Sequence, residues 1–152
     1  MNTSKITDND FKKLTKIGVV IPTRNRSKEL QAALLCMINQ DIQIEEVVVV
    51  DSSDNFDQLP TYSASEIKVT HVHTAVRSAA EQRNIGKRML NKSVDFLAFI
   101  DDDILVERDY VSRLVSVLFA TEAVGVSGIA TNQKINKKRL KPFGLSGLIH
   151  RI

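Results

Sequence analysis

Three consecutive aspartates, Asp101, Asp102 and Asp103, follow an apolar run at residues 96–100 that has the pattern of a strand buried on both faces. In a strand, Asp101 and Asp103 would share one face and Asp102 would point to the other. Two carboxylates roughly 6 Å apart, at an effective dielectric of about 20, repel by ~3 kcal/mol. A divalent cation that takes oxygen ligands removes this repulsion. The triplet therefore predicts a metal site with Asp101 and Asp103 as ligands.

Other interpretations of the triplet stay open at this point. Aspartates also cap helices, because a carboxylate is favoured near a helix N-terminus. The next helical pattern begins near Asp109, which is too far along the chain for Asp101 to cap it. The remaining alternative is a solvated acidic turn, which needs no ligand.

Two further polar clusters, at residues 22–26 and 51–54, also follow apolar runs. Arg24 and Arg26 in the first cluster could bind an anion, because the guanidinium fork matches a phosphate group. Asp51 in the second cluster could accept hydrogen bonds from a nucleobase or a ribose, as an acidic residue does in dinucleotide-binding folds. Aspartate is also a favoured turn former, so this assignment of Asp51 stays open.

Four other side chains are of types that could bind a ligand. Arg83, in Arg83-Asn84-Ile85-Gly86, offers the same fork to phosphate, although an exposed helical arginine is the simpler explanation of its position alone. The three histidines, His71, His73 and His150, lack a spacing typical of a metal cluster. We assign the histidines no role.

Periodic apolar patterns predict the elements that position these residues. Apolar residues at i, i+3, i+4, i+7 and i+8 predict a helix from Ser27 to Gln40. A capping box over Ser78-Ala79-Ala80-Glu81 predicts the start of a second helix. The predicted strands cover residues 17–21, 47–50, 67–72, 96–100 and 123–130, and the predicted helices cover residues 27–40, 78–91 and 109–120.

This alternation predicts an α/β fold with an open, mainly parallel sheet and helices on both faces. Each of the three polar clusters follows the carboxyl end of a predicted strand. In open α/β sheets that edge binds ligands at the topological switch point. We therefore expect residues 22–26, 51–54 and 101–103 to meet at one pocket.

Length and apolar content narrow the class of protein. A chain of 152 residues is long enough for one domain with a buried core. Its start lacks the apolar segment of a secretory signal, and no apolar stretch approaches the length of a membrane span. These features predict a cytoplasmic protein.

The net charge of +3 is unevenly distributed, because residues 134–152 hold six Lys or Arg residues and no acid. This basic tail could contact anionic lipid at the inner face of the membrane, or a phosphate-bearing substrate. A solvated tail explains the same residues more simply. Aromatic residues make up only 5% of the chain, and it contains no recognised nucleic-acid-binding motif, so we expect no nucleic-acid partner.

Four ordered motifs resemble those of family 2 glycosyltransferases, which have the GT-A fold. The motifs are Ile17-Gly18-Val19-Val20-Ile21-Pro22-Thr23-Arg24-Asn25-Arg26, Val50-Asp51, Arg83-Asn84-Ile85-Gly86 and Phe99-Ile100-Asp101-Asp102-Asp103. Each motif is weak alone, but four of them in order and at family-like intervals are specific, and they cover roughly Lys16 to Ala130. The resemblance implies a Rossmann-like domain that binds a sugar-nucleotide donor.

The resemblance also implies a donor, a metal and residue roles. The donor would be a nucleotide-diphosphate sugar, with a UDP-sugar or a dTDP-sugar as first candidates. Asp101 and Asp103 would form the DxD motif that holds Mn²⁺ or Mg²⁺, Arg83 would lie near the donor phosphates, and Asp51 would contact the base. The implied nucleotide-sugar-binding residues are Pro22, Thr23, Arg24, Asn25, Asp51, Arg83, Asp101 and Asp102. Family members transfer the sugar with inversion, so a base must deprotonate the acceptor.

The chain departs from the family pattern after the DxD motif. The catalytic carboxylate of the family lies well beyond that motif, but the last acid of this chain is Glu122, so the catalytic residue and the acceptor are left unknown. We expect the donor-binding half of an enzyme that is truncated or completed by another chain. Its expected parts are an N-terminal extension at 1–15, a sugar-nucleotide-binding domain at 16–131, and a basic tail or the start of a missing acceptor-binding half at 132–152.

Two rival functions fit part of the same pattern. A non-catalytic nucleotide-binding or assembly module is the alternative, since it could use the same sheet edge only to hold a ligand or partner. A sugar-phosphate nucleotidyltransferase is not favoured. Such enzymes usually carry a Gly-rich, basic loop after the first strand, where this chain has Pro22-Thr23-Arg24-Asn25.

Overall fold

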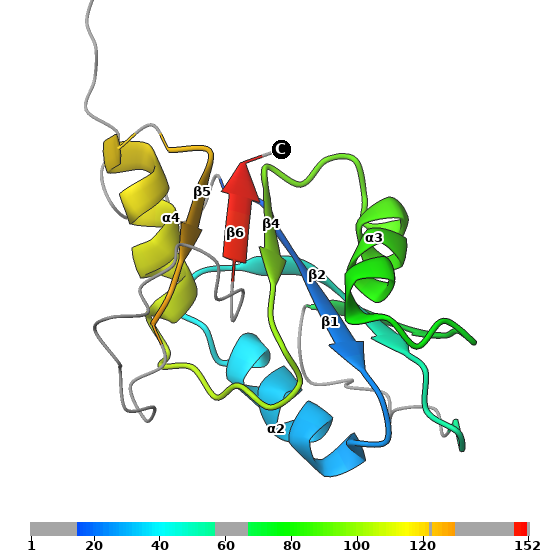
Figure 1. The fold of residues 1–152 in the computed structure, drawn as a ribbon. Helices are drawn as coiled ribbons and strands as arrows, with labels where there is room; N and C mark the ends of the chain where they lie inside the picture. Colours follow the sequence, from blue (N-terminus) through cyan, green and yellow to red (C-terminus); the bar gives the residue numbers. More distant parts are fainter. Residues whose placement is uncertain (1–14, 57–66, 122, 130–147, 152) are drawn as a thin grey trace, which may run out of the picture.

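The computed structural model describes residues 15–56, 67–121, 123–129 and 148–151 (Figure 1). In chain order the elements are β1 (Ile17–Thr23), α2 (Ser27–Ile38), β2 (Ile44–Asp51), β3 (Lys68–His73), α3 (Ala79–Met89), β4 (Phe96–Phe99), α4 (Tyr110–Thr121), β5 (Gly125–Ser127) and β6 (Leu148–Arg151). None of the described helices is both long and apolar enough to cross a membrane.

The strands form one six-stranded sheet in the order β3-β2-β1-β4-β6-β5. β1 pairs in parallel with β2 and β4, and β2 pairs in parallel with β3. β6 is antiparallel to its two neighbours, β4 and β5. The predicted open, mainly parallel sheet is therefore confirmed. The chain builds outward from β1 to β3 and then returns to the other side of β1, so a topological switch point lies between β1 and β4.

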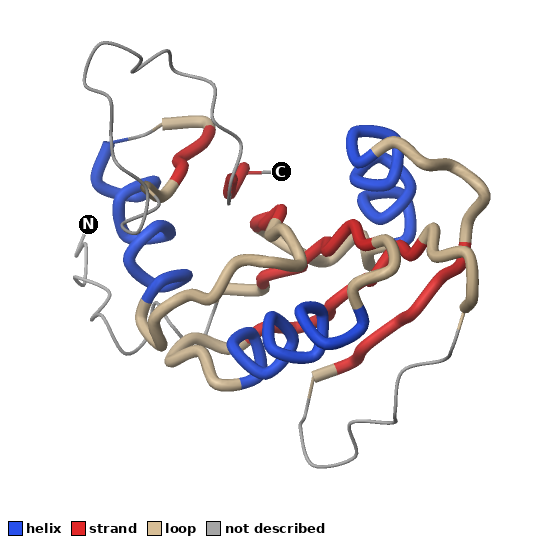
Figure 2. The backbone as a smooth tube through the Cα atoms, turned by 60° about the horizontal axis from the view of Figure 1, so that its bottom comes forward, coloured by secondary structure: helices blue, strands red, loops and turns tan. Residues whose placement is uncertain are grey.

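Helices cover both faces of the sheet, as predicted, because its central strands are apolar on both sides. Ile17, Val19 and Ile21 of β1 belong to a core cluster that includes apolar side chains of α2 and α4. Val20 points the other way and belongs to a smaller cluster with Leu90, next to the end of α3. In Figure 2, α2 and α3 accordingly lie on opposite sides of the strands.

Helix α3 approaches the sheet closely through Gly86. A Cβ atom at this position would lie 2.3 Å from Cγ1 of Val20, so only glycine lets the helix come this near to β1. The Ser78 side chain caps the helix by accepting a hydrogen bond from the Glu81 N–H at 3.4 Å, as the capping box predicts. The first turn of α3 is thereby held at the carboxyl ends of β1 and β2, where the Gln82 side chain bonds to both strands.

Strand β1 is longer than predicted, because it continues through Pro22 to Thr23. Proline removes only one backbone donor, and the Thr23 carbonyl still accepts a hydrogen bond from the Ser52 N–H at 3.0 Å. This extension carries Thr23 to the edge of the sheet at which the polar clusters gather.

Strand β2 also starts earlier than predicted, at Ile44. Its charged residues obscured this start in the sequence, yet Glu46 is buried. The Glu46 carboxylate accepts hydrogen bonds from Lys68 Nζ at 2.6 Å and from the Asn91 N–H at 2.9 Å. These partners allow a carboxylate inside the sheet, at the end opposite the polar clusters.

The remaining boundaries show where the sequence patterns were less informative. The three predicted helices are confirmed to within two residues at each end. β4 ends at Phe99 and β5 covers only Gly125–Ser127, while β6 was not predicted. The predicted N-terminal extension, the end of the predicted strand at Ala130 and the basic run at 134–141 fall mostly or wholly outside the described residues, and the predicted domain limits stay predictions.

Candidate functional site

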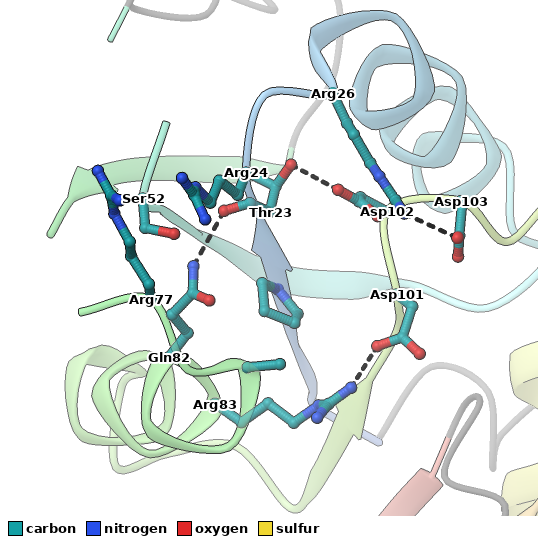
Figure 3. Close-up of a pocket in the computed structure, with 12 residues that line it drawn as sticks. Thr23, Arg24, Arg26, Ser52, Arg77, Gln82, Arg83, Asp101, Asp102 and Asp103 are labelled. Atoms are coloured by element: carbon teal, nitrogen blue, oxygen red, sulfur yellow. Dashed lines mark hydrogen bonds and ion pairs between the residues drawn. The ribbon is translucent and has the colours of Figure 1, made fainter. Parts of the chain in front are cut away.

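A cavity of about 370 Å³ lies at the carboxyl ends of β1, β2 and β4 (Figure 3). This is the edge at which open α/β sheets bind ligands. Most of its lining side chains are polar or charged. The lining residues are Pro22, Thr23, Arg24, Arg26, Ser52, Arg77, Ala79, Gln82, Arg83, Asp101, Asp102 and Asp103. The structure therefore brings residues of all three predicted polar clusters together, with α3 as a further wall.

Asp102 is the buried member of the acidic triplet. Its carboxylate accepts a hydrogen bond from Thr23 Oγ1 at 2.6 Å and another from Arg26 Nη1 at 3.1 Å. The same Arg26 nitrogen lies 2.8 Å from Asp103 Oδ2, in a more exposed ion pair. The hydrogen bond to Asp102 is the main reason why the pKa of Arg26 is raised above its ordinary value, and Asp103 adds to it. Arg26 therefore joins the start of α2 to the acidic turn.

The expectation that Asp101 and Asp103 share one face of a strand is wrong. β4 ends at Phe99, so the alternation of strand side chains does not extend to the triplet. Asp101 turns toward Arg83 of α3, and Asp103 turns toward Arg26 at the start of α2 (Figure 3). Within the described ranges, no three His, Cys, Asp or Glu side chains gather closely enough to hold a metal ion by themselves.

Asp54 links the loops that border the cavity on the side of β2. Its carboxylate accepts hydrogen bonds from Asn25 Nδ2 at 2.9 Å and from Arg77 Nη2 at 2.6 Å, and Arg24 Nη2 lies 3.4 Å away. Asn25 in return accepts from the Asp54 N–H at 3.0 Å, and its φ of 55° is a left-handed conformation that asparagine tolerates. The hydrogen bond from Asn25 is the main cause of the lowered pKa of Asp54, and the two arginines add to it.

Asp51 lies just outside the cavity lining. It is buried, its Oδ2 atom lies 3.1 Å from His71 Nε2, and its Oδ1 atom accepts a hydrogen bond from the Ser53 N–H at 2.7 Å. His71, to which the sequence analysis assigned no role, therefore braces Asp51. The pairing register of β2 with β3 brings Asp51 and His71 together. This register cannot be read from the sequence alone.

The structure separates the predicted site residues into two groups. Those that line the cavity are Pro22, Thr23, Arg24, Arg83, Asp101 and Asp102, together with the candidate anion-binding residue Arg26 and the predicted metal ligand Asp103. Asn25 and Asp51 support the surrounding loops without lining it. The lining residues that sequence reasoning missed are Ser52, Arg77, Ala79 and Gln82. Ala79 lies within the capping box, and Arg77 and Gln82 flank it. This helix start had to face the sheet edge, and that position is the signal that could have found the three residues.

Two buried polar atoms at the cavity lack a hydrogen-bond partner among the residues that the structure describes. They are Ser52 Oγ and Arg83 Nε. Buried groups of this kind are costly when unpaired, so both are suited to a bound molecule or to ordered water. Gln82 differs from them, because its Nε2 atom donates to the Thr23 carbonyl at 3.0 Å and to the Val50 carbonyl at 2.8 Å. Gln82 therefore holds the strand ends in place.

Comparison with known families decides the class of protein. Residues 18–149 match the model of the family described as glycosyl transferase family 2, and this match covers most of the chain. The chain belongs to glycosyl transferase family 2. The resemblance predicted from the four motifs is thereby confirmed.

Among its relatives, an uncharacterized glycosyltransferase of Rickettsia felis is 27% identical to this family 2 domain over 127 residues. The aligned part is 82% of this chain but only 20% of the relative. The chain thus spans about a fifth of the length of the curated relatives that it matches first.

Solved structures share the fold of this family 2 domain. The mannosyltransferase PcManGT of Pyrobaculum calidifontis, in complex with GDP-Man and Mn²⁺, has a TM-score of 0.69 and 20% identity over 89% of this chain and 44% of that one. S. aureus TarS 1–349 has a TM-score of 0.64 and 21% identity over 90% of this chain and 47% of that one. TarS 1–349 has also been solved in complex with UDP-GlcNAc. These similarities confirm the GT-A, Rossmann-like architecture.

Proposed function

We propose that this family 2 domain binds a nucleotide-diphosphate sugar in the cavity and presents it for inverting sugar transfer. One observation carries this proposal. Four arginines line the same cavity as the acidic turn, namely Arg24, Arg26, Arg77 and Arg83. Guanidinium groups suit the two phosphates of such a donor, because they match phosphate oxygens in geometry and charge. The neighbours solved with GDP-Man and with UDP-GlcNAc support this class of ligand.

The nucleoside end of the donor is proposed to lie toward the ends of β1 and β2. Pro22 and Thr23 would line it, with the unpaired Ser52 hydroxyl available for one further hydrogen bond. Asp51 and Asn25 would support the loops at the nucleoside end of the cavity. Asp51 would contact the base where the nucleoside extends beyond the residues that line the cavity. Sequence resemblance favours uridine or deoxythymidine as the nucleoside.

The phosphates are proposed to lie toward α3 and the acidic turn. Arg83 uses its Nη2 atom in the pair with Asp101, its side chain is 20% exposed, and its guanidinium carries further N–H donors that could bond to a phosphate oxygen. Arg24 and Arg77 flank the same cavity, where both pair with the Asp54 carboxylate. These pairs are exposed and therefore weak, so both arginines can turn to the phosphates of a bound donor.

The acidic turn fits a divalent cation in its chemistry and its exposure. Asp101 and Asp103 offer oxygen donors, with 29% and 54% of their side chains exposed. Mg²⁺ is commonly held by one or two carboxylates together with substrate phosphates and water, which agrees with a pair of ligands rather than a complete protein cage. Bound Mn²⁺ or Mg²⁺ would neutralise charge on the departing nucleoside diphosphate.

The proposal keeps the domain limits inferred from the sequence, with the sugar-nucleotide-binding domain at 16–131, an extension before it and a basic tail, or the start of an acceptor-binding half, after it. We place the protein in the cytoplasm, where the basic run at 134–141 could contact anionic lipid at the inner face of the membrane.

Calorimetric titration with nucleotide sugars tests this proposal. UDP-GlcNAc, GDP-Man and a dTDP-sugar would each be titrated into the protein, once with Mn²⁺ and once with EDTA. We expect at least one donor to bind in Mn²⁺ and to lose most of its affinity in EDTA, because EDTA removes the cation that would join the acidic turn to the diphosphate. If no donor binds under either condition, the proposed function is wrong. If binding is equally strong in EDTA, the metal part of the proposal is wrong.

A further inference from the structure

Each carboxylate of the acidic turn is already paired with an arginine that lines the same cavity. Arg83 pairs with Asp101, while a single Arg26 nitrogen bridges Asp102 at 3.1 Å and Asp103 at 2.8 Å. These arginines therefore neutralise the carboxylates that the proposed function assigns to a metal ion. A divalent cation that reaches Asp103 must compete with the Arg26 guanidinium.

Arg26 occupies a position where local preferences oppose an arginine. It is the N-cap residue of α2, and its side chain makes no capping hydrogen bond. Small polar residues are preferred at this position, and a positive charge at a helix N-terminus opposes the helix dipole. Such a violation of local preferences is expected where a side chain serves a site instead of its own element. The two aspartates offset the unfavourable charge in the ligand-free protein.

The two ion pairs of Arg26 differ in how easily they are exchanged. Asp102 has only 8% of its side chain exposed and also accepts the Thr23 hydroxyl, so it forms a fixed anchor. Asp103 and Arg26 are about half exposed, with side-chain values of 54% and 49%. Exposed ion pairs are weak, because water and ions screen them. Arg26 can therefore release Asp103 while Asp102 keeps its side chain at the cavity.

We propose that Arg26, one of the four arginines at the cavity, exchanges its partner on donor binding. It holds the cation position beside Asp103 in the ligand-free protein and passes to the donor diphosphate when a divalent cation binds there. This inference rests on the proposed function. Metal and nucleotide then assist each other, because the cation displaces Arg26 and the diphosphate accepts it. By thermodynamic linkage, the factor by which nucleotide strengthens metal binding equals the factor by which metal strengthens nucleotide binding.

The variant Arg26→Gln separates this role from a purely structural one, because it should change two affinities in opposite directions. Mn²⁺ alone, measured by electron paramagnetic resonance of the free ion, should bind about twofold to fivefold more tightly, since the competing ion pair is gone. UDP or GDP at saturating Mn²⁺, whichever the wild type binds, should bind about tenfold more weakly, since a charge-assisted hydrogen bond is lost. Arg26→Lys should restore most of the wild-type affinity for Mn²⁺ alone.

The control is Arg113→Gln, because Arg113 pairs with Asp109 at the surface at 3.6 Å and does not line the cavity. It should leave both affinities unchanged. If Arg26→Gln binds Mn²⁺ alone no better than the wild type, or binds the nucleotide equally well, the inference is wrong although the proposed function stands. If the wild type itself shows no Mn²⁺-dependent nucleotide binding, both are wrong.

Discussion

At the scale of single residues, three identical side chains in the acidic turn have different surroundings. Asp102 is buried and both of its oxygens are bonded, whereas Asp101 and Asp103 are partly exposed at the cavity. We therefore propose a positioning role for Asp102, which holds Thr23 and Arg26, and propose its more exposed neighbours as the metal ligands. The sequence alone treats the three residues alike, because the distinction depends on Thr23, which is 79 positions away along the chain.

The variant Thr23→Val tests this positioning role. Valine keeps the shape of threonine but leaves one oxygen of buried Asp102 without its donor, so we expect the free energy of unfolding to fall by about 1–3 kcal/mol. Urea-induced unfolding measures this loss. The control is Thr121→Val, because that hydroxyl bonds the Val117 carbonyl on an exposed part of α4 and its loss should cost less than about 0.5 kcal/mol. Equal losses in the two variants would contradict the role of Thr23.

At the scale of elements, the contact of α3 with β1 sets the position of Arg83 and Gln82. Gly86→Ala places a methyl group against Val20, so we expect a loss of about 1–3 kcal/mol from overpacking, although alanine favours a helix by about 1 kcal/mol. Chemical denaturation of the variant measures the difference. Adding Val20→Ala to it should recover part of the loss, since the two changes share one contact.

A matched comparison for this contact is Gly18→Ala. Its added methyl would lie 2.9 Å from the flexible end of the Leu90 side chain, which can move aside, and 3.3 Å from Cγ1 of Val94, where a shift of a few tenths of an ångström is enough. We therefore expect a smaller loss of stability than for Gly86→Ala. A Gly86→Ala protein as stable as the wild type would show that α3 does not depend on close approach to β1.

The sequence predicted elements well where periodicity was strong and failed where charge or pairing intervened. Runs of β-branched and apolar residues defined β1, β2 and β4, and the four ordered motifs were sufficient to indicate the family. The start of β2 was missed because Glu46 is charged, although partners bury it. β6 was missed because its place in the sheet depends on pairing with β4, far away in the chain.

The candidate site was predictable to a similar degree. The polar clusters that follow the strands could be assigned to one edge, because parallel strands align their carboxyl ends. The pairing of Asp51 with His71 and of Asp54 with Arg77 could not, since each depends on tertiary contacts. The expected orientation of Asp101 and Asp103 was wrong for a local reason, because the chain leaves strand geometry after Phe99 and the alternation of side chains does not reach the triplet.

At the scale of the whole molecule, a mainly parallel sheet with helices on both faces places arginines and aspartates at one switch point. Strand order decides this, since β1 lies between β2 and β4 and their three following loops meet. Charges of both signs at one cavity suit a ligand that brings phosphates and a metal together. We therefore propose that this edge binds a nucleotide-diphosphate sugar through a divalent cation.

The most direct measurement of this claim is the Mn²⁺-dependent affinity of Asp103→Asn for the nucleotide sugar that the wild type binds. We predict an affinity at least about tenfold lower. Mutating a residue that only orients a metal ligand typically costs about tenfold or more in metal affinity, and removing the ligand itself should cost at least as much. Its melting temperature should stay close to that of the wild type, since Asp103 is exposed. The control Asp109→Asn removes an exposed carboxylate outside the cavity and should keep full affinity. If Asp103→Asn binds as tightly as the wild type, the acidic turn does not hold a metal for the donor.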